Sequence, residues 1–191
     1  MYQTSISTHR FLANLSVYQS FLSDECCKLI QAAYDESEKI DNSGYGKDNL
    51  INTERTDWSA HKNEKAAQVW RSIVDVFNDA FFRDMRAGRS INLNLSLFES
   101  WIAVSTENSF VAPHDHGDCP FMWSFSFYAK IPNKQSSINF GGAGSDNIKI
   151  SVREGDLLLF PSHLQHYSND TVPGRTIFSG NFWVKVEAMN D

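Results

Sequence analysis

APHDHGD (residues 112–118) and GDLLLFPSHLQH (residues 155–166) together hold four of the six histidines of the chain. Residues two apart on an extended chain point to the same side, so His114, His116 and Asp118 can face one cavity. The second stretch is an apolar run that ends in a turn, with His166 after the turn. Two close ligands from one strand and a third from a distant strand can hold three corners of an octahedron, and this pattern predicts a mononuclear metal site.

The residue types leave the metal and its ligands open. Imidazole and carboxylate ligands suit Fe(II), Mn(II), Ni(II) and Zn(II), although a facial triad with open positions is typical of non-haem iron sites. Two ligand sets fit the spacing. One is His114, His116 and His166. The alternative is His116, Asp118 and His166, in which a carboxylate offsets part of the metal charge. We expect His163 to lie in a turn at the surface.

The second half of the chain has the pattern of short strands. Two sets of side chains alternate with the period of a half-buried strand, namely Phe121, Trp123, Phe125 and Phe127 against Met122, Ser124, Ser126 and Tyr128. Strands are expected at 91–104, 121–131, 136–140, 147–153, 156–160, 165–168 and 175–187, with Gly and Pro residues between them. Strands of this length predict an all-β barrel or sandwich, with Trp101 and Trp123 in its core.

The first half is expected to be mainly helical. Ser23, followed by Asp24 and Glu25, is typical of a helix start, with a capping hydroxyl and acids in the first turn. A second helix is expected from about residue 63 to about Gly88, because apolar residues recur there every three or four positions. The polar segment 41–62 is long for a connection between helices, and we hypothesise that it is a lid.

These patterns predict a single domain over residues 1–191, mainly β with N-terminal helices. Residues 1–90 form a helical support region, and residues 91–187 form a jelly-roll-like β core. No internal repeat or linker divides the chain.

Charge and composition exclude several classes of function. The formal net charge is −6 and no basic run occurs, which argues against nucleic-acid binding. No apolar stretch approaches the roughly 20 residues of a membrane span, and the N-terminus does not resemble a signal peptide. Three cysteines, two of them adjacent, are a poor disulfide framework and favour a reducing, cytoplasmic setting. Cys119 is expected to be a small buried residue rather than a metal ligand. The oligomeric state is not predicted.

Residues 95–186 resemble the Fe(II)- and 2-oxoglutarate-dependent dioxygenase superfamily. Residues 155–162 with His166 look like the strand and turn that lead to the distal iron histidine, and GRTIFSGNF (174–182) looks like the strand whose arginine binds 2-oxoglutarate. FLSDECC (21–27) resembles the opening helix of the prolyl-hydroxylase-like branch. The His-x-His sequence departs from the usual His-x-Asp pattern and is similar to an uncharacterised subgroup of the family. This similarity favours His114, His116 and His166 as the ligands, with Asp118 as the rival.

The resemblance implies a double-stranded β-helix, a cupin-like jelly roll, and a site that uses Fe(II), 2-oxoglutarate and O2. Arg175 would bind the distal carboxylate of 2-oxoglutarate, because a guanidinium fork matches a carboxylate. Ser179 lies an even number of residues further along the strand and shares its face. Tyr128 and Ser126, on one side of a central strand, are further candidates for hydrogen bonds to the co-substrate.

The reaction implied by the resemblance is hydroxylation of a prime substrate that the sequence does not identify. A peptide or protein side chain is the first candidate, because of the prolyl-hydroxylase-like opening, and a small molecule is the second. Two other functions compete. A cupin-like three-histidine metalloenzyme would not need 2-oxoglutarate, and a non-enzymatic β-sandwich binding module would carry its histidines without a metal.

Overall fold

The computed structural model describes residues 6–10, 16–40, 53–85, 91–107, 109–117, 119, 121–133, 136–141, 147–168 and 172–188. Its helices are α1 (Asp24–Glu36), η2 (Ala60–Lys62) and α2 (Glu64–Met85). Its strands are β1 (Ser7–Arg10), β2 (Ser16–Phe21), β3 (Lys39–Ile40), β4 (Thr53–Thr56), β5 (Ile91–Ser105), β6 (Val111–His114), β7 (Met122–Lys130), β8 (Ser136–Phe140), β9 (Ile148–Val152), β10 (Asp156–Pro161), β11 (His166–Ser168) and β12 (Thr176–Ala188).

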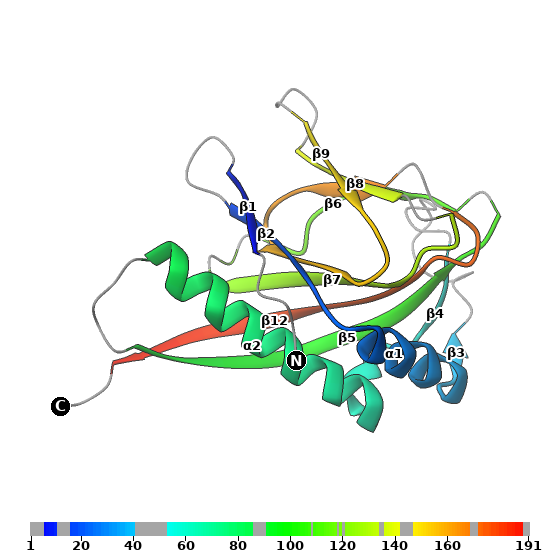
Figure 1. The fold of residues 1–191 in the computed structure, drawn as a ribbon, viewed down its shortest axis with the longest axis horizontal. Coiled ribbons are helices and arrows are strands. Elements are labelled where there is room, and N and C mark those ends of the chain that lie inside the picture. Colours follow the sequence, from blue (N-terminus) through cyan, green and yellow to red (C-terminus); the bar gives the residue numbers. More distant parts are fainter. Residues whose placement is uncertain are drawn as a thin grey trace.

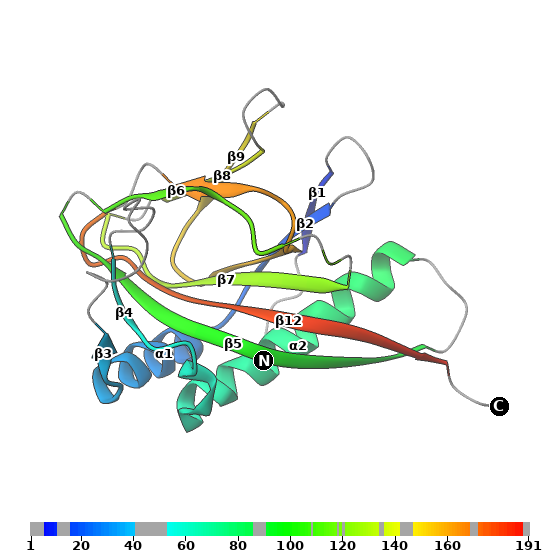
Figure 2. The same ribbon diagram turned by 180° about the vertical axis from the view of Figure 1, so that it is seen from behind.

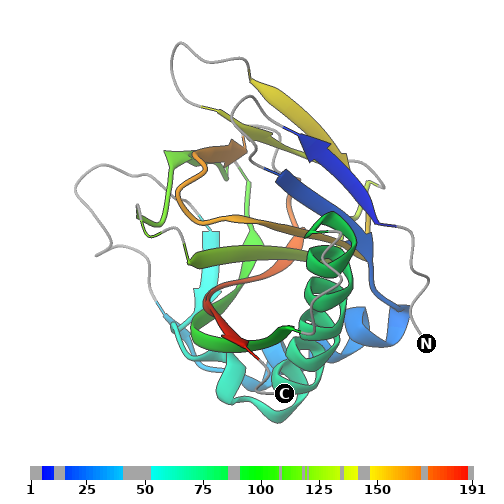
Figure 3. The same ribbon diagram turned by 90° about the vertical axis from the view of Figure 1, so that its left-hand side faces the viewer.

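The strands of the described residues form two antiparallel sheets. The large sheet has the order β1-β2-β10-β7-β12-β5-β4-β3, and the small sheet has the order β6-β11-β8-β9. Figure 1 shows α1 and α2 on one side of the large sheet and the small sheet on the other. The long strands β5 and β12 pair along their whole length and can be followed across the molecule in Figure 2. Figure 3, seen from the end, shows the two sheets facing each other across an interior.

The central strand β7 separates two environments. Phe125 and Phe127 point to the helical side and are buried in the cluster that also holds residues of α1 and α2. Ser124, Ser126 and Tyr128 point to the other side and line the space between the sheets. The alternation expected from the sequence is therefore the division between the apolar core and the pocket.

Both helices begin where their sequences provide a cap. The Ser23 hydroxyl accepts a hydrogen bond from the backbone N–H of Cys26, with acidic residues in the first turn of α1. The Asn63 side chain accepts from the backbone N–H groups of Lys65 and Ala66 at the start of α2. The apolar face of α2 then packs on the large sheet, with Phe77 fully buried. No described helix is long and apolar enough to cross a membrane.

The strand pattern of the second half is confirmed to within one or two residues at each boundary. The expectation that residues 1–90 are helical apart from connections is incomplete, because β1, β2, β3 and β4 belong to the large sheet. β2 was missed because Val17, Tyr18 and Ser20 are all buried, so its sequence does not alternate. β6 was missed because it has only four residues and because a proline, Pro113, argues against a strand in the sequence. β6 lies at the edge of the small sheet, where a proline is tolerated.

Candidate metal centre

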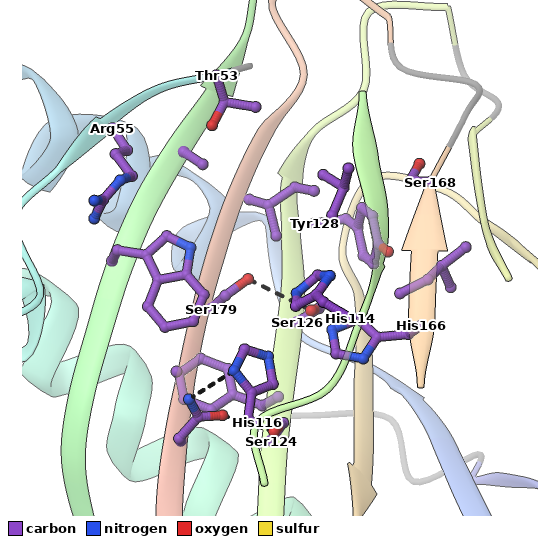
Figure 4. A pocket seen from close by; sticks show the side chains of 18 of the residues that line it. Thr53, Arg55, His114, His116, Ser124, Ser126, Tyr128, His166, Ser168 and Ser179 are labelled. Carbon is purple, nitrogen blue, oxygen red and sulfur yellow. Dashed lines mark hydrogen bonds between the residues drawn. The ribbon is translucent and has the colours of Figure 1, made fainter. Parts of the chain in front are cut away.

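Three histidines meet between the two sheets. His114 ends β6 and lies opposite His166 of β11 in the sheet register, and His116 follows two residues later. One ring nitrogen of each lies within 4.8 Å of the others. The backbone N–H of His116 donates to the carbonyl of Ser162 at 2.9 Å, which holds the chain after β6 against the turn before β11. Figure 4 shows the three rings turned toward one another.

Two of the three rings have a defined orientation. Nδ1 of His114 lies 2.8 Å from the carbonyl oxygen of Ala112, and Nδ1 of His166 lies 3.0 Å from that of Leu164. A carbonyl oxygen only accepts, so both Nδ1 atoms carry the proton. Nε2 of each neutral ring is then an unprotonated lone-pair donor, which is the state that a metal ion requires.

His116 has a different partner. Its Nδ1 lies 3.3 Å from Nδ2 of Asn181, drawn as a dashed line in Figure 4. Asn181 lies on β12 and is fully buried. Its Oδ1 accepts from the Ser124 hydroxyl at 2.6 Å, and its Nδ2 donates to Oε1 of Glu99 at 2.5 Å. The polar side chains behind His116 therefore form one hydrogen-bonded group between β5, β7 and β12.

Burial keeps two of these rings neutral. Burial lowers the pKa of His116 to about 4, with a smaller contribution from His114. Burial, and then the two other histidines, lower the pKa of His166 well below its usual value of 6.5. Neutral imidazole is the ligand form, so these two rings have the charge state of a metal ligand at neutral pH.

These lowered pKa values predict how the metal-free protein responds to acid. Between pH 6.5 and about 4 the unfolded chain binds protons that the folded chain excludes, so the free energy of unfolding falls as the pH falls. We expect a lower Tm at pH 5 than at pH 7 in calorimetry of chelator-treated protein. The Tm of His163→Ala should fall between pH 7 and pH 5 as much as that of the wild type, whereas the Tm of His166→Asn should fall less. An unchanged Tm across this range would contradict the prediction.

The histidines form part of the wall of a cavity of about 210 Å³ between the sheets. Arg175, just before β12, lines the same cavity and is 2% exposed. Its Nη1 donates to the hydroxyls of Ser136 and Ser168 at 2.9 and 3.2 Å. Its Nε has no hydrogen-bond partner, and no carboxylate of the described residues forms an ion pair with it. Burial lowers the pKa of Arg175.

The other residues predicted to contact a co-substrate lie in the same cavity. Tyr128, Ser126 and Ser179 all line it, and the hydroxyls of Ser126 and Ser179 are 3.4 Å apart. Burial raises the pKa of Tyr128 to about 12, so its hydroxyl stays protonated and can donate. Ile177 takes the position on β12 between Arg175 and Ser179 and makes that part of the wall apolar.

Sequence reasoning missed the opposite wall. Trp101 was expected in the core but is only partly buried and lines the cavity, with its ring 6.1 Å from that of His116. Trp58 meets Trp101 edge to face at 4.8 Å, and the guanidinium of Arg55 lies 4.0 Å over the Trp58 ring. An aromatic residue at an alternating strand position looks the same in the sequence whether it faces the core or a pocket.

Part of the hypothesised lid forms this wall. Within 41–62, residues 53–62 comprise β4, which pairs with β5, and η2. β4 is a strand of the large sheet rather than a segment folded over it. Residues 41–52 lie outside the described residues, and so does Asp118, the rival ligand.

Two residues near the histidine cluster in the sequence, His163 and Cys119, were not predicted to be metal ligands. His163 lies in the turn between β10 and β11 and is partly exposed, outside the histidine cluster. Cys119 is a free, partly buried thiol and does not belong to the cluster either.

No protein-family model matches the chain, and a comparison with curated proteins finds no similar sequence. Solved structures do match. A prolyl 4-hydroxylase from Pseudomonas putida has 18% identity and a TM-score of 0.62, over 90% of this chain and 94% of that one. HygX from Streptomyces hygroscopicus, solved with nickel and 2-oxoglutarate bound, has 13% identity and a TM-score of 0.55, over 88% and 82%.

A third match is SnoK, a non-haem α-ketoglutarate-dependent carbocyclase from nogalamycin biosynthesis, with 13% identity and a TM-score of 0.62 over 87% and 79% of the two chains. At identities this low, the structural similarity establishes a common fold alone. The two facing antiparallel sheets, with the helices outside the larger one, confirm the architecture expected from the sequence. The chain has the double-stranded β-helix fold of the 2-oxoglutarate- and Fe(II)-dependent oxygenases.

Proposed function

We propose that the protein is an Fe(II)- and 2-oxoglutarate-dependent oxygenase, with His114, His116 and His166 as its iron ligands. One observation carries the proposal: a buried arginine with no acidic partner among the described residues shares a cavity with the three clustered histidines. A metal site alone would fit many reactions. A guanidinium beside the metal site that has no acidic partner of its own can bind an anion, which indicates that the reaction uses an acidic co-substrate.

The histidines fit a divalent cation of the first transition row. Three imidazoles converge from two segments, and two of them already present an unprotonated Nε2. Imidazole is a ligand that suits iron, and three protein ligands leave coordination positions open. All three ligands are neutral, so the site keeps the full charge of the metal.

Arg175 fits the distal carboxylate of a dicarboxylic keto acid. A buried cation without an anion is unfavourable, and an unpartnered buried N–H adds a desolvation cost. A carboxylate at the free side of the guanidinium would remove both costs. The Tyr128 hydroxyl, whose proton is retained at neutral pH, is a second donor from the neighbouring strand.

When bound, iron and 2-oxoglutarate would supply the oxidative chemistry, in which O2 is the oxidant both for the keto acid, which is decarboxylated to succinate, and for a prime substrate. The chain contributes positioning and exclusion of water. His114, His116 and His166 would hold the metal. Arg175 fixes the far end of the co-substrate, and Ile177 and Phe160 make the wall near it apolar.

For the prime substrate we propose a peptide or protein side chain. The support is the sequence 21–27, which resembles the opening helix of prolyl-hydroxylase-like proteins and does form the start of α1. Among the matching structures are a prolyl hydroxylase from Trichoplax adhaerens in complex with a peptide fragment and HygX with hygromycin B bound. A small-molecule substrate is the alternative outcome of a substrate screen. The cysteines are all free, in keeping with a proposed cytoplasmic setting.

Anaerobic titration tests the proposal. Fe(II) is added to metal-free protein and then 2-oxoglutarate, and the weak visible charge-transfer band of a chelated keto acid is recorded. We expect the band only when both are present, and succinate release in air once a substrate is supplied. Iron binding without a band would favour a cupin-like enzyme that does not use 2-oxoglutarate. Absence of iron binding would refute the proposal.

A further inference from the structure

The hydrogen bonds of His116 do not suit a metal ligand as they stand. In His114 and His166, Nδ1 faces a carbonyl oxygen, which places the proton on Nδ1 and leaves Nε2 for the metal. In His116, Nδ1 faces the Nδ2 amide group of Asn181, which only donates. Nδ1 of His116 must then accept, and the single proton of the neutral ring sits on Nε2. A protonated Nε2 has no lone pair for a metal.

Glu99 fixes the amide in this orientation. Nδ2 of Asn181 donates to the Glu99 carboxylate at 2.5 Å, while Oδ1 accepts from Ser124 at 2.6 Å. If the amide turned by 180°, its oxygen would face the Glu99 carboxylate, and two acceptors would meet. Asn181 is fully buried, so water does not offer a substitute partner. The charged partner therefore holds Asn181 in the donating orientation.

We propose that Asn181 and Glu99 set the tautomer of His116 and thereby restrain the metal affinity of the site. The inference rests on the proposed function, because it takes His116 to be a ligand. Metal binding through Nε2 requires the proton on Nδ1, the Asn181 oxygen turned toward it, and the Glu99 carboxylate displaced. Asn181 and Glu99 act through His116 and are positioning residues.

Two substitutions release this restraint by different routes. Glu99→Gln keeps the size of the side chain but adds N–H groups, which can donate to a turned Asn181 oxygen. Asn181→Asp places a carboxylate beside His116, and a carboxylate accepts from a protonated Nδ1 as in many metal-bound histidines. If the carboxylate that Asn181→Asp introduces beside Glu99 impairs folding, the double variant Glu99→Gln/Asn181→Asp removes the repulsion and keeps the test.

The first readout is the tautomer in metal-free protein. In nitrogen-15 spectra of histidine-labelled protein, long-range couplings distinguish protonated from unprotonated ring nitrogens, and His116→Asn identifies the His116 signals. We expect the proton on Nε2 in the wild type and on Nδ1 in Asn181→Asp. In Glu99→Gln we expect a population with the proton on Nδ1, because the glutamine amide can accept from Nδ2 of Asn181 or donate to its Oδ1. A wild-type ring protonated on Nδ1 would overturn the inference.

The second readout is affinity for Zn(II), measured by competition with a chelator at fixed pH. Changes in the partner of a ligating histidine alter metal affinity by roughly 10- to 100-fold, so we expect Glu99→Gln to bind Zn(II) about tenfold more tightly. Loss of the Glu99 negative charge near a cation would by itself weaken Zn(II) binding. A gain in affinity therefore indicates release of the restraint on His116, and a loss indicates a charge effect. Glu107→Gln, an exposed acid outside the pocket, is the matched control and should not change the affinity.

The two hypotheses fail in distinguishable ways. Tight Zn(II) binding by the wild type, with no gain in Glu99→Gln, overturns the restraint and leaves the proposed function standing. If no variant binds Zn(II), the proposed function fails and the claim on affinity fails with it, whatever tautomer the spectra show.

Discussion

His114→Ala is expected to abolish iron binding, and Asp118→Ala is expected to preserve it. His114 presents Nε2 to the cluster because its Nδ1 is held by the Ala112 carbonyl, and its ring is 4.4 Å from that of His166. Removal of this ring leaves two protein ligands. Replacement of an outer-shell partner already costs about 10- to 100-fold in metal affinity, so loss of a ligand should cost at least about 100-fold.

Anaerobic titration with Fe(II) measures this difference. His163→Ala is the matched control, because it removes an imidazole a few residues before His166 without touching the cluster. Retention of iron by His114→Ala together with its loss in Asp118→Ala would establish the other ligand set, with His116, Asp118 and His166. The pair of variants thus decides between the two registers that the sequence allows.

Much of the fold could be predicted because the β core obeys simple patterns. β7 alternates between phenylalanines for the core and serines or tyrosine for the pocket, and glycines and prolines mark its neighbours. β10 is buried along its whole length, so it reads as a continuous apolar run before His166. The same patterns grouped the histidines, whereas Arg175 was assigned to the site by the resemblance to the dioxygenases.

The remaining site residues depend on contacts between distant segments. Glu99 and Asn181 are opposite each other on β5 and β12, with a register irregularity after Asn181. Nothing local to either residue indicates that their side chains meet behind His116. Trp58 and Trp101 likewise meet only because β4 pairs with β5. Local patterns assign a residue to a face, but they do not assign its partner across the sheet.

Arg175→Met is expected to have opposite effects on co-substrate binding and on stability. The guanidinium is buried and has no acidic partner among the described residues, so the unliganded fold bears the cost of a desolvated charge. An apolar side chain of similar length removes that cost, and we expect the Tm of the unliganded protein to be unchanged or higher. Affinity for 2-oxoglutarate should fall by about 2–5 kcal/mol, the usual effect of removing one partner of a buried charge pair.

Thermal unfolding with and without 2-oxoglutarate, in the presence of a redox-inert divalent metal, measures both effects in one experiment. Arg71→Met is the matched control, since Arg71 is exposed on α2 and does not line the cavity, so it should change neither quantity. Arg175→Lys keeps the charge but not the fork, so it should lose much of the affinity while keeping the cost of the buried charge. A marked loss of Tm in Arg175→Met, with 2-oxoglutarate affinity intact, would make Arg175 a structural residue, held in place by Ser136 and Ser168, and the acidic co-substrate would lose its anchor.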